Sequence, residues 1–284
     1  EDSEIARQSL RAACVRMPDR EACASQLAKA ISNASTSTQT TILEILAEMG
    51  GQAALETVSA AAMSADAQQQ DDGSRLLGKW NSVAAAPSLM SLATSGPTAK
   101  YRLRGLRGYI GVARKFPMPE SQRVEMCRKA FDQATRIDEQ KLVLDVLKIH
   151  PSAEGLALAL RAQKVSALKS DATLAASQIA QKLGGKGIDI AAMLNAGGIK
   201  TVKLQIIRAE YGADGIVKDV TEIVRKRAGS VPWIALPAGG YNTSFGGDPV
   251  PGQVKQLTIQ YLMDGKQGTA SFAENAPILL PLPK

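Results

Sequence analysis

Hydrophobic residues recur in pairs, three positions apart, along the first two thirds of the chain. The pairs are Leu43/Leu46, Leu77/Trp80, Leu106/Tyr109 and Leu144/Leu147, and Leu10 and Ile179 continue the series at either end. Successive positions in the series lie 33, 34, 29, 38 and 35 residues apart. An interval of this size is typical of helical repeats, in which each unit buries its hydrophobic face against its neighbours. The pattern therefore predicts a helical solenoid.

Prolines mark where the second helix of a pair begins. A proline in the first helical turn costs little stability, because its missing N–H would be unpaired there. An acidic residue or serine after the proline interacts favourably with the positive end of the helix dipole. Such prolines are Pro18, Pro87, Pro119 and Pro151. In the second pair Gly50-Gly51 ends the first helix instead. We expect helix pairs over residues 3–33, 37–64, 70–95, 98–134 and 137–166, and a final helix over 171–183.

Beyond Gly198 the hydrophobic period changes to two residues. Hydrophobic and polar residues alternate over 202–206 and 257–263, which is typical of half-buried strands. Asp264-Gly265 follows the second of these stretches and is a strong two-residue hairpin signal. Two further short strands, over 231–236 and 278–280, and one short helix, over 219–227, complete the predicted elements.

These patterns predict an α+β multidomain chain, with an α-solenoid of about five helix pairs followed by a small, mainly antiparallel β domain. We expect the solenoid over 1–185, a glycine-rich connector over 186–198 and the β domain over 199–284. The composition agrees with stacked helices, because aromatic residues supply only 4% of the chain while Ala and Leu are abundant.

Both parts of the chain resemble known families. The repeat period, the Leu positions and the proline placement resemble HEAT-type repeats, including the short variety named after phycobilisome lyases. In the C-terminal part the ordered segments are IRAEYGA at 207–213, DVT at 219–221, GDP at 247–249, KQLTIQY at 255–261 and then Gly265. This set is similar to the C-terminal domain of the DnaJ subfamily C member eleven proteins, which also occurs at the ends of large multidomain bacterial proteins. The resemblance carries over no catalytic residues, and without a J domain it implies no co-chaperone activity.

The net charge of +7 is spread thinly along the chain. Residues 1–200 carry 25 basic and 20 acidic groups, and residues 201–284 carry 9 and 7. A wholly basic nucleic-acid-binding domain is therefore not indicated. No uninterrupted hydrophobic run reaches the ~18 residues that a membrane-spanning helix needs.

One segment, 100–115, departs from this balance. It holds six basic residues, and no acidic residue occurs from 100 to 119. On a helix, one face would carry the basic stripe Lys100, Arg104, Arg107 and Arg114. The stripe has two interpretations: a surface that attracts acidic protein segments or phosphates, or a solvent face whose Arg side chains cover neighbouring helices.

A loop over 239–249 is the most distinctive non-helical stretch. It combines several glycines with the candidate binding residues Tyr241, Asn242 and Asp248. The loop is either a binding loop or a turn-rich connection stabilised by Asp248 and the proline after it.

The cysteines allow a disulfide but no metal site. Cys14 and Cys23 lie symmetrically about the turn at 17–20, so antiparallel helices would bring them together. They form either a disulfide, which would indicate an oxidising, extracytoplasmic compartment, or two buried thiols in a helix contact. The chain has no CxxC motif and His150 is its only histidine, so we expect no metal and no cofactor.

No spacing of Ser, Cys, His and Asp predicts a catalytic group. We therefore expect a non-enzymatic protein-interaction or assembly scaffold. The chain begins at Glu1, which suggests a piece of a larger multidomain bacterial protein. The expected partner is a protein with an acidic surface; the alternative is a nucleic-acid-binding helical repeat that uses 100–115. If the basic stripe is a free surface, replacing Arg104 and Arg107 by Glu should abolish binding and leave the melting temperature unchanged.

Overall fold

The computed structural model describes residues 2–183, 189–198, 201–234, 236, 240–276 and 278–283. The chain divides into two compact units, Glu1–Ile149 and His150–Lys284. This division falls inside the fifth expected helix pair. The expected domain limits at 185 and 198 stay a prediction, and the Gly184-Gly185 end of the solenoid lies outside the described residues.

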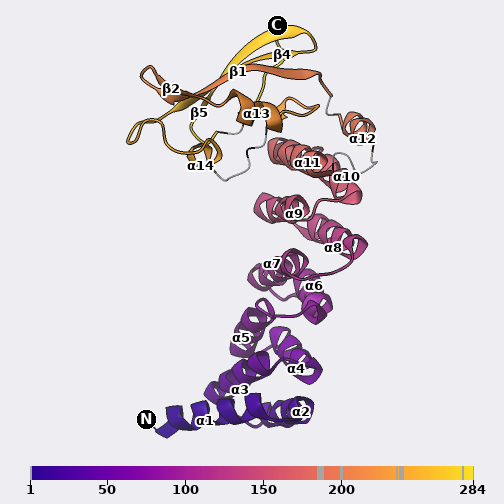
Figure 1. The fold of residues 1–284 in the computed structure, drawn as a ribbon. Coiled ribbons are helices and arrows are strands. Elements are labelled where there is room, and N and C mark those ends of the chain that lie inside the picture. Colours follow the sequence, from indigo (N-terminus) through magenta and orange to yellow (C-terminus); the bar gives the residue numbers. More distant parts are fainter. Residues whose placement is uncertain are drawn as a thin grey trace. The chain divides into compact units, whose positions relative to one another are not determined.

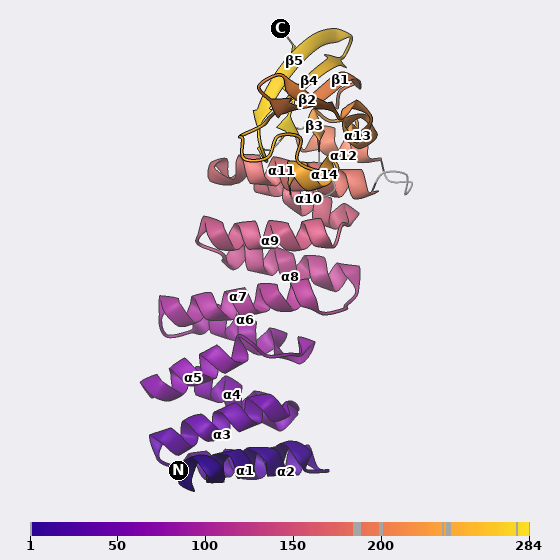
Figure 2. The same cartoon turned by 60° about the vertical axis from the view of Figure 1, so that its left-hand side comes forward.

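The first unit is a stack of antiparallel helix pairs. Its elements are α1 (Asp2–Arg16), α2 (Arg20–Ile31), α3 (Thr36–Met49), α4 (Gln52–Ala62), α5 (Ala67–Leu77), α6 (Ala86–Ser95), α7 (Ala99–Lys115), α8 (Glu120–Gln133) and α9 (Ile137–Ile149), with a 3-10 turn at Val83–Ala85. The odd-numbered helices form one layer and the even-numbered helices the other (Figure 1). Figure 2 shows the same helices stacked one above another. Consecutive odd-numbered helices contact each other throughout the unit.

The second helices begin where the proline signals predict. Asp19, next to Pro18, accepts a hydrogen bond from the N–H of Ala22 at 2.9 Å and so caps α2. Pro87 lies in the first turn of α6, and Pro119 immediately precedes α8. The local signals for helix starts are therefore confirmed in these pairs.

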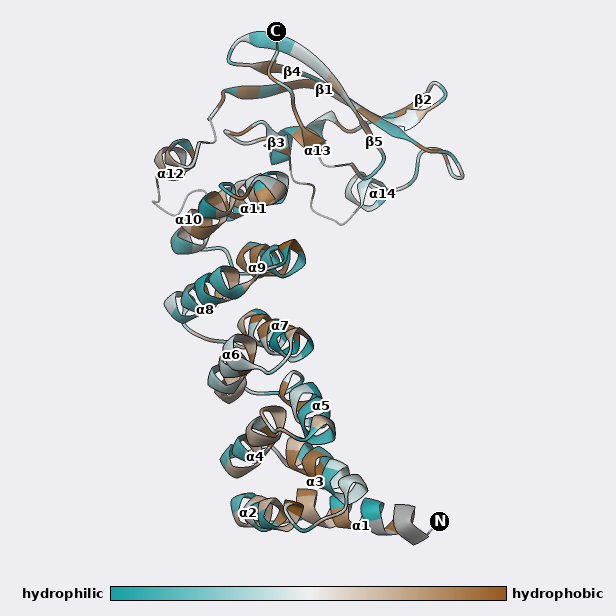
Figure 3. Ribbon diagram, turned by 180° about the vertical axis from the view of Figure 1, so that it is seen from behind, coloured by the Kyte–Doolittle hydropathy of each residue, from teal (hydrophilic) through white to brown (hydrophobic). Residues whose placement is uncertain are grey.

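The hydrophobic pairs that define the repeat form the interior between the two layers. Most of the predicted positions are buried, namely Leu43, Leu46, Leu77, Trp80, Leu106, Tyr109, Leu144 and Leu147. Hydrophobic and hydrophilic segments accordingly occur together on these helices (Figure 3). Leu10 differs, with 42% of its surface exposed; in the described part of the chain α1 contacts α2 and α3.

Two glycines allow adjacent helices to touch backbone to backbone. A Cβ atom on Gly73 in α5 would lie 2.4 Å from the backbone nitrogen of Ala62 in α4. A Cβ atom on Gly105 in α7 would lie 2.7 Å from the backbone nitrogen of Ala93 in α6. Any larger residue at either position would push two helices apart.

The second unit begins with helices and ends with a sheet. Its helical elements are α10 (Ala153–Ala162), a 3-10 turn at Ser166–Leu168, α11 (Lys169–Leu183) and α12 (Ile190–Ala196). Helices α10 and α11 pack through small residues such as Ala159, Ala172 and Ala176, which have no exposed surface. No helix of the described ranges is long and apolar enough to cross a membrane.

The β domain is small and antiparallel, as expected. Its elements are β1 (Leu204–Ala213), β2 (Ile216–Asp219), α13 (Thr221–Arg227), β3 (Trp233–Ile234), α14 (Tyr241–Ser244), β4 (Gln256–Met263), β5 (Lys266–Ala273) and β6 (Ile278–Leu279). The main sheet has the order β2-β1-β4-β5, and β3 pairs with β6 in a second sheet. The α+β fold class, helical repeats followed by a small antiparallel domain, is therefore confirmed.

Two Asp-Gly turns connect the strands of the main sheet. Asp264-Gly265 joins β4 to β5, as its sequence predicts, with φ angles of 51° and 82°. Asp214-Gly215 joins β1 to β2 with φ angles of 48° and 82°. Positive φ at both central positions defines the type I′ hairpin turn, which favours these residues. The second turn was not predicted from the sequence.

One face of the main sheet forms the core of the β domain. Alternate residues of β1 and β4 point into it, including the fully buried Tyr211 and Tyr261. Val224 of α13 and Phe245, directly after α14, are buried in the same cluster. The loop that contains α14 is thus part of the hydrophobic core.

Candidate functional site

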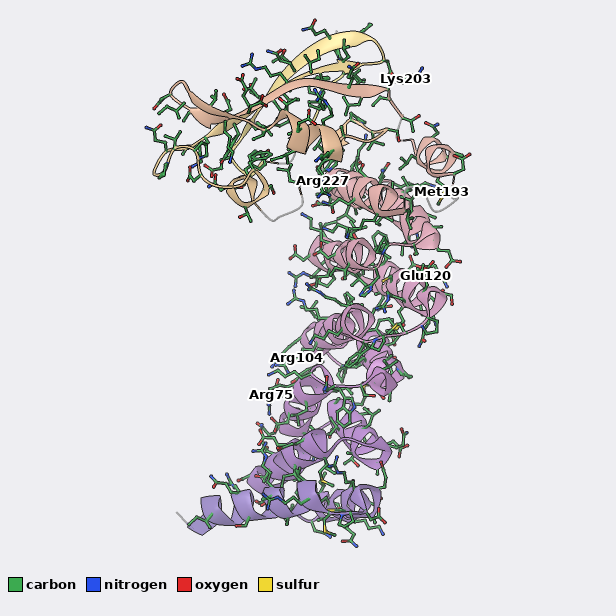
Figure 4. All side chains as sticks on the ribbon, in the orientation of Figure 1. Arg75, Arg104, Glu120, Met193, Lys203 and Arg227 are labelled. Carbon is green, nitrogen blue, oxygen red and sulfur yellow. The ribbon has the colours of Figure 1, made fainter. Side chains whose placement is uncertain are left out.

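Two members of the basic stripe of α7 face one acidic residue on α5. Lys100 forms an ion pair with Asp71, and Arg104 Nη1 lies 2.8 Å from Asp71 Oδ1 and 3.0 Å from Ser74 Oγ. The hydrogen bond from Lys100, followed by that from Arg104, holds the pKa of Asp71 below its ordinary value. Figure 4 shows Arg104 and Arg75 on the same edge of the stack, with Glu120 on the opposite edge.

The same stripe faces α9 on its other side. Arg107 donates two hydrogen bonds to Glu139 Oε1, from Nε at 3.0 Å and from Nη2 at 2.7 Å. The Glu139 side chain is only 1% exposed, whereas half of Arg107 is in contact with solvent. Arg114, the last predicted member of the stripe, is an exposed residue in the final turn of α7.

Comparable contacts link the earlier odd-numbered helices. Arg11 of α1 forms an ion pair with Glu48 of α3, and Arg75 Nη2 of α5 lies 3.4 Å from Glu44 Oε1 of α3. We call these contacts, together with those of Lys100, Arg104 and Arg107, the inter-repeat ladder. Three residues of the basic stripe, Lys100, Arg104 and Arg107, thus form ion pairs with neighbouring repeats, and the stripe is not a row of free cations.

A pocket of about 420 Å³ opens beside α7, among α6, α8 and α9. We call it the α7–α9 pocket. Its apolar wall consists of Ala93, Ala99, Leu103 and Leu106. Its polar lining consists of Lys100, Arg102, Gln133, Thr135, Arg136 and Glu139. Three cations and one carboxylate therefore line the pocket, and that carboxylate already binds Arg107.

One oxygen of the Glu139 carboxylate accepts no hydrogen bond from the described residues. This atom, Oε2, is buried. Arg136 Nε forms an ion pair with this atom at 3.7 Å, which is too long for a hydrogen bond. A buried acceptor without a donor costs about 1–3 kcal/mol. A ligand that donates a hydrogen bond here would recover that cost.

Arg102 and Arg136 are the cations that the sequence analysis missed. Arg102 Nη1 donates to the carbonyl of Gly96 at 2.8 Å, and no ion pair to a described carboxylate uses its charge. Arg136 is 56% exposed and lies 3.3 Å from Asp138. Arg102 falls off the stripe that begins at Lys100, and Arg136 lies in the turn before α9, so helical periodicity selects neither.

The predicted loop residues of the β domain lie together in a polar network. Asn242 Oδ1 accepts a hydrogen bond from the hydroxyl of Tyr211 at 2.8 Å, and Asn242 Nδ2 donates to Glu274 Oε1 at 3.1 Å. Asp248 Oδ2 lies 3.0 Å from Lys255 Nζ, which is also 3.3 Å from Glu274 Oε2. The Lys255 side chain is only 3% exposed. The network fixes the loop to the ends of β1, β4 and β5.

The electrostatics of this network agree with a structural role. Burial opposes the charge of Lys255, but hydrogen bonds with Asp248 and Glu274 raise its pKa above the ordinary value. Tyr241 packs against Tyr211 and Phe245, with ring centres 5.6 and 5.4 Å away, and donates to the carbonyl of Ala276 at 2.5 Å. Tyr241, Asn242 and Asp248 thus all make contacts within the domain. Their role in binding stays a prediction.

The two cysteines expected near each other do lie together, as free thiols. Cys14 and Cys23 are both buried, where α1 meets α2. Burial, followed by the neighbouring Cys23, raises the pKa of Cys14 to about 11. The disulfide is not formed in this structure, which has the alternative arrangement of two buried thiols in a helix contact. No argument for an oxidising compartment follows from them.

Neither metal chemistry nor similarity assigns a function to these sites. Within the described ranges no three His, Cys, Asp or Glu side chains are grouped to hold a metal ion. Comparison of the chain with known protein families, with curated proteins and with solved structures finds no match.

Proposed function

We propose that this chain is a non-enzymatic protein-interaction module whose helical repeats bind an acidic, partly hydrophobic peptide segment of a partner. The α7–α9 pocket carries the proposal. It combines the apolar wall of Leu103 and Leu106 with the cations Arg102 and Arg136 at its edge. Helical repeats commonly use such extended surfaces for binding.

The charges of the pocket favour an anionic partner over a cationic one. Lys100 pairs with Asp71, and Arg136 lies near Asp138 and Glu139, so Arg102 is the lining cation that forms no ion pair with a described carboxylate. The field of these cations attracts carboxylates and speeds encounter. Glu139 Oε2, which accepts no hydrogen bond from the described residues, adds a specific requirement, because it needs a donor such as a backbone N–H or a hydroxyl. A peptide supplies both groups.

The ladder weakens the case for nucleic acid as the ligand. Binding to a phosphate backbone depends on several cations that can each neutralise a phosphate. Lys100, Arg104 and Arg107 already pair with Asp71 and Glu139. A phosphate would have to displace those carboxylates. A short acidic peptide needs only the cations at the pocket edge.

Fluorescence anisotropy with defined probes tests this proposal. The probes are a labelled peptide of alternating Glu and Leu, the same peptide with Gln for Glu, and a labelled DNA duplex. We expect the acidic peptide to bind most tightly and the double variant R102E/R136E to lose about tenfold in affinity, because two attractive charges become repulsive. The matched control K29E/K79E makes the same charge change at exposed positions elsewhere in the first unit.

Three outcomes would contradict the proposal. If K29E/K79E weakened peptide binding as much as R102E/R136E, the loss of affinity would come from the overall charge and not from the pocket. Tighter binding of the duplex than of the peptide would favour the nucleic-acid alternative. No binding of the acidic peptide to the unmodified chain would remove the pocket as an interaction site.

A further inference from the structure

A second pocket lies within the second unit, among α10, the start of α11 and α12. Its volume is about 590 Å³, within the usual range for small-molecule sites. Leu160 of α10 and Met193 of α12 form much of its apolar lining. Met193 is labelled on α12 in Figure 4. We call this cavity the α10–α12 pocket.

The charged groups of this pocket are all cations. Arg161 and Lys164 lie three positions apart on and just after α10, and therefore share a helix face. Lys169 begins α11. No carboxylate occurs among the described residues that line the pocket. In the described part of the chain, neither Lys164 nor Lys169 forms an ion pair, in contrast to Lys100 of the first unit.

Gln163 supplies a hydrogen-bond donor that has no use within the protein. Its side-chain Nε2 is buried and donates to no acceptor in the described ranges, although Gln163 lines the pocket. A buried amide without an acceptor is destabilising. Such a group in a pocket surrounded by cations points to a ligand that brings acceptor oxygens.

We propose that the α10–α12 pocket binds a small organic anion, with a carboxylate or phosphate head group and an apolar body. The oxygens of the head group accept a hydrogen bond from Gln163 and pair with Lys164 and Lys169. The apolar body lies against Leu160 and Met193, where its burial adds affinity that a free inorganic ion cannot gain. This site is independent of the peptide-binding proposal, because every described residue that lines it belongs to the second unit.

Isothermal titration calorimetry with four probes tests this inference. Phenyl phosphate and benzoate carry both features, inorganic phosphate carries only the charge, and benzyl alcohol only the apolar body. We expect one or both aromatic anions to bind, and to bind more tightly than inorganic phosphate and benzyl alcohol. Whichever aromatic anion binds better identifies the head group.

Variants separate this site from general surface charge. K164E/K169E should lose at least about tenfold in affinity, because two charge-assisted hydrogen bonds are replaced by repulsion. The control K226E/K266E makes the same charge change on exposed side chains of the same unit and should bind normally. Q163M removes the donor in a similar volume. It should raise the melting temperature of the free protein and weaken anion binding roughly tenfold.

Several results would overturn the inference. Failure of both aromatic anions to bind the unmodified protein would exclude the site. Equal affinity for phenyl phosphate and inorganic phosphate would show that the apolar lining of the pocket does not contribute to binding. Equal loss in K164E/K169E and K226E/K266E would leave only non-specific attraction. Unchanged binding by Q163M would show that the amide donates to no ligand.

Discussion

Charge reversal at Arg107 is expected to lower the stability of the first unit. The sequence alone suggested that replacing Arg104 and Arg107 by Glu would leave the melting temperature unchanged. In the structure Arg107 makes two hydrogen bonds to Glu139, which is almost completely buried. R107E would leave that carboxylate without its main partner and place a second carboxylate beside it.

The structure sets the size of this effect. Removing one partner of a fully buried ion pair costs about 3–5 kcal/mol, whereas exposed pairs contribute about 0–1 kcal/mol. Arg107 is half exposed, so water reaches the site and reduces the cost. We expect a loss of about 1–3 kcal/mol, which for a unit of this length corresponds to a decrease in melting temperature of roughly 3–10 °C.

Far-ultraviolet circular dichroism on the full chain, with heat and with urea, measures this loss. The control K79E reverses a charge on an exposed residue that forms no ion pair in the described part of the chain. A double-mutant cycle of R107A and E139Q isolates the pair, since neutralising Glu139 should recover part of the stability that R107A loses. Equal melting temperatures for R107E and K79E, or an additive cycle, would refute the assignment of the ladder as a stabilising contact.

Three further predictions follow from packing and titration. G73V should lower the free energy of unfolding, measured in urea, by at least ~2 kcal/mol, because the added carbons meet the backbone of α4. The control G111A has open space around the added Cβ and should raise the free energy of unfolding by up to about 1 kcal/mol. Burial raises the pKa of Cys127 to about 12, so the folded state keeps a proton that the unfolded state loses from about pH 9. Stability should therefore fall as the pH rises from about 9 towards 12, by up to about 1.4 kcal/mol per pH unit from this group, and C127V should reduce that slope in urea titrations. K255M should increase amide hydrogen exchange of residues 241–248 without unfolding the helical repeats, since Lys255 pairs with the carboxylates that hold this loop; unchanged exchange would contradict that role.

The helical repeats could be predicted well because their signals are local. Leu and Pro positions repeat along the chain, and each helix start depends on a few consecutive residues, as at Pro119. The Asp264-Gly265 turn was found for the same reason. The identical dipeptide Asp214-Gly215 was missed, although the same signal was present. The strands beside it do not show a clear two-residue alternation, since Ile216 and Val217 are consecutive and both exposed.

The site residues were harder to predict because they depend on contacts between distant segments. Glu139 meets Arg107 only after two repeats stack, and Lys255 becomes buried only when the loop containing Asp248 folds over it. One signal in the sequence was available. The ladder partners Arg11/Glu48, Arg75/Glu44 and Arg107/Glu139 are 37, 31 and 32 residues apart, close to the hydrophobic period. Opposite charges spaced by one repeat would have indicated structural pairing of the basic stripe.

The inter-repeat ladder also means that the loss of different helix pairs would bring different charges together. Helix α3 offers carboxylates to both neighbours and α7 offers cations to both, while α9 offers a carboxylate to α7. Loss of the α5–α6 pair would bring the carboxylates of α3 against the cations of α7, which attract. Loss of the α7–α8 pair would bring Asp71 of α5 against Glu139 of α9, which repel. The charges of the ladder therefore oppose loss of the α7–α8 pair but do not oppose loss of the α5–α6 pair.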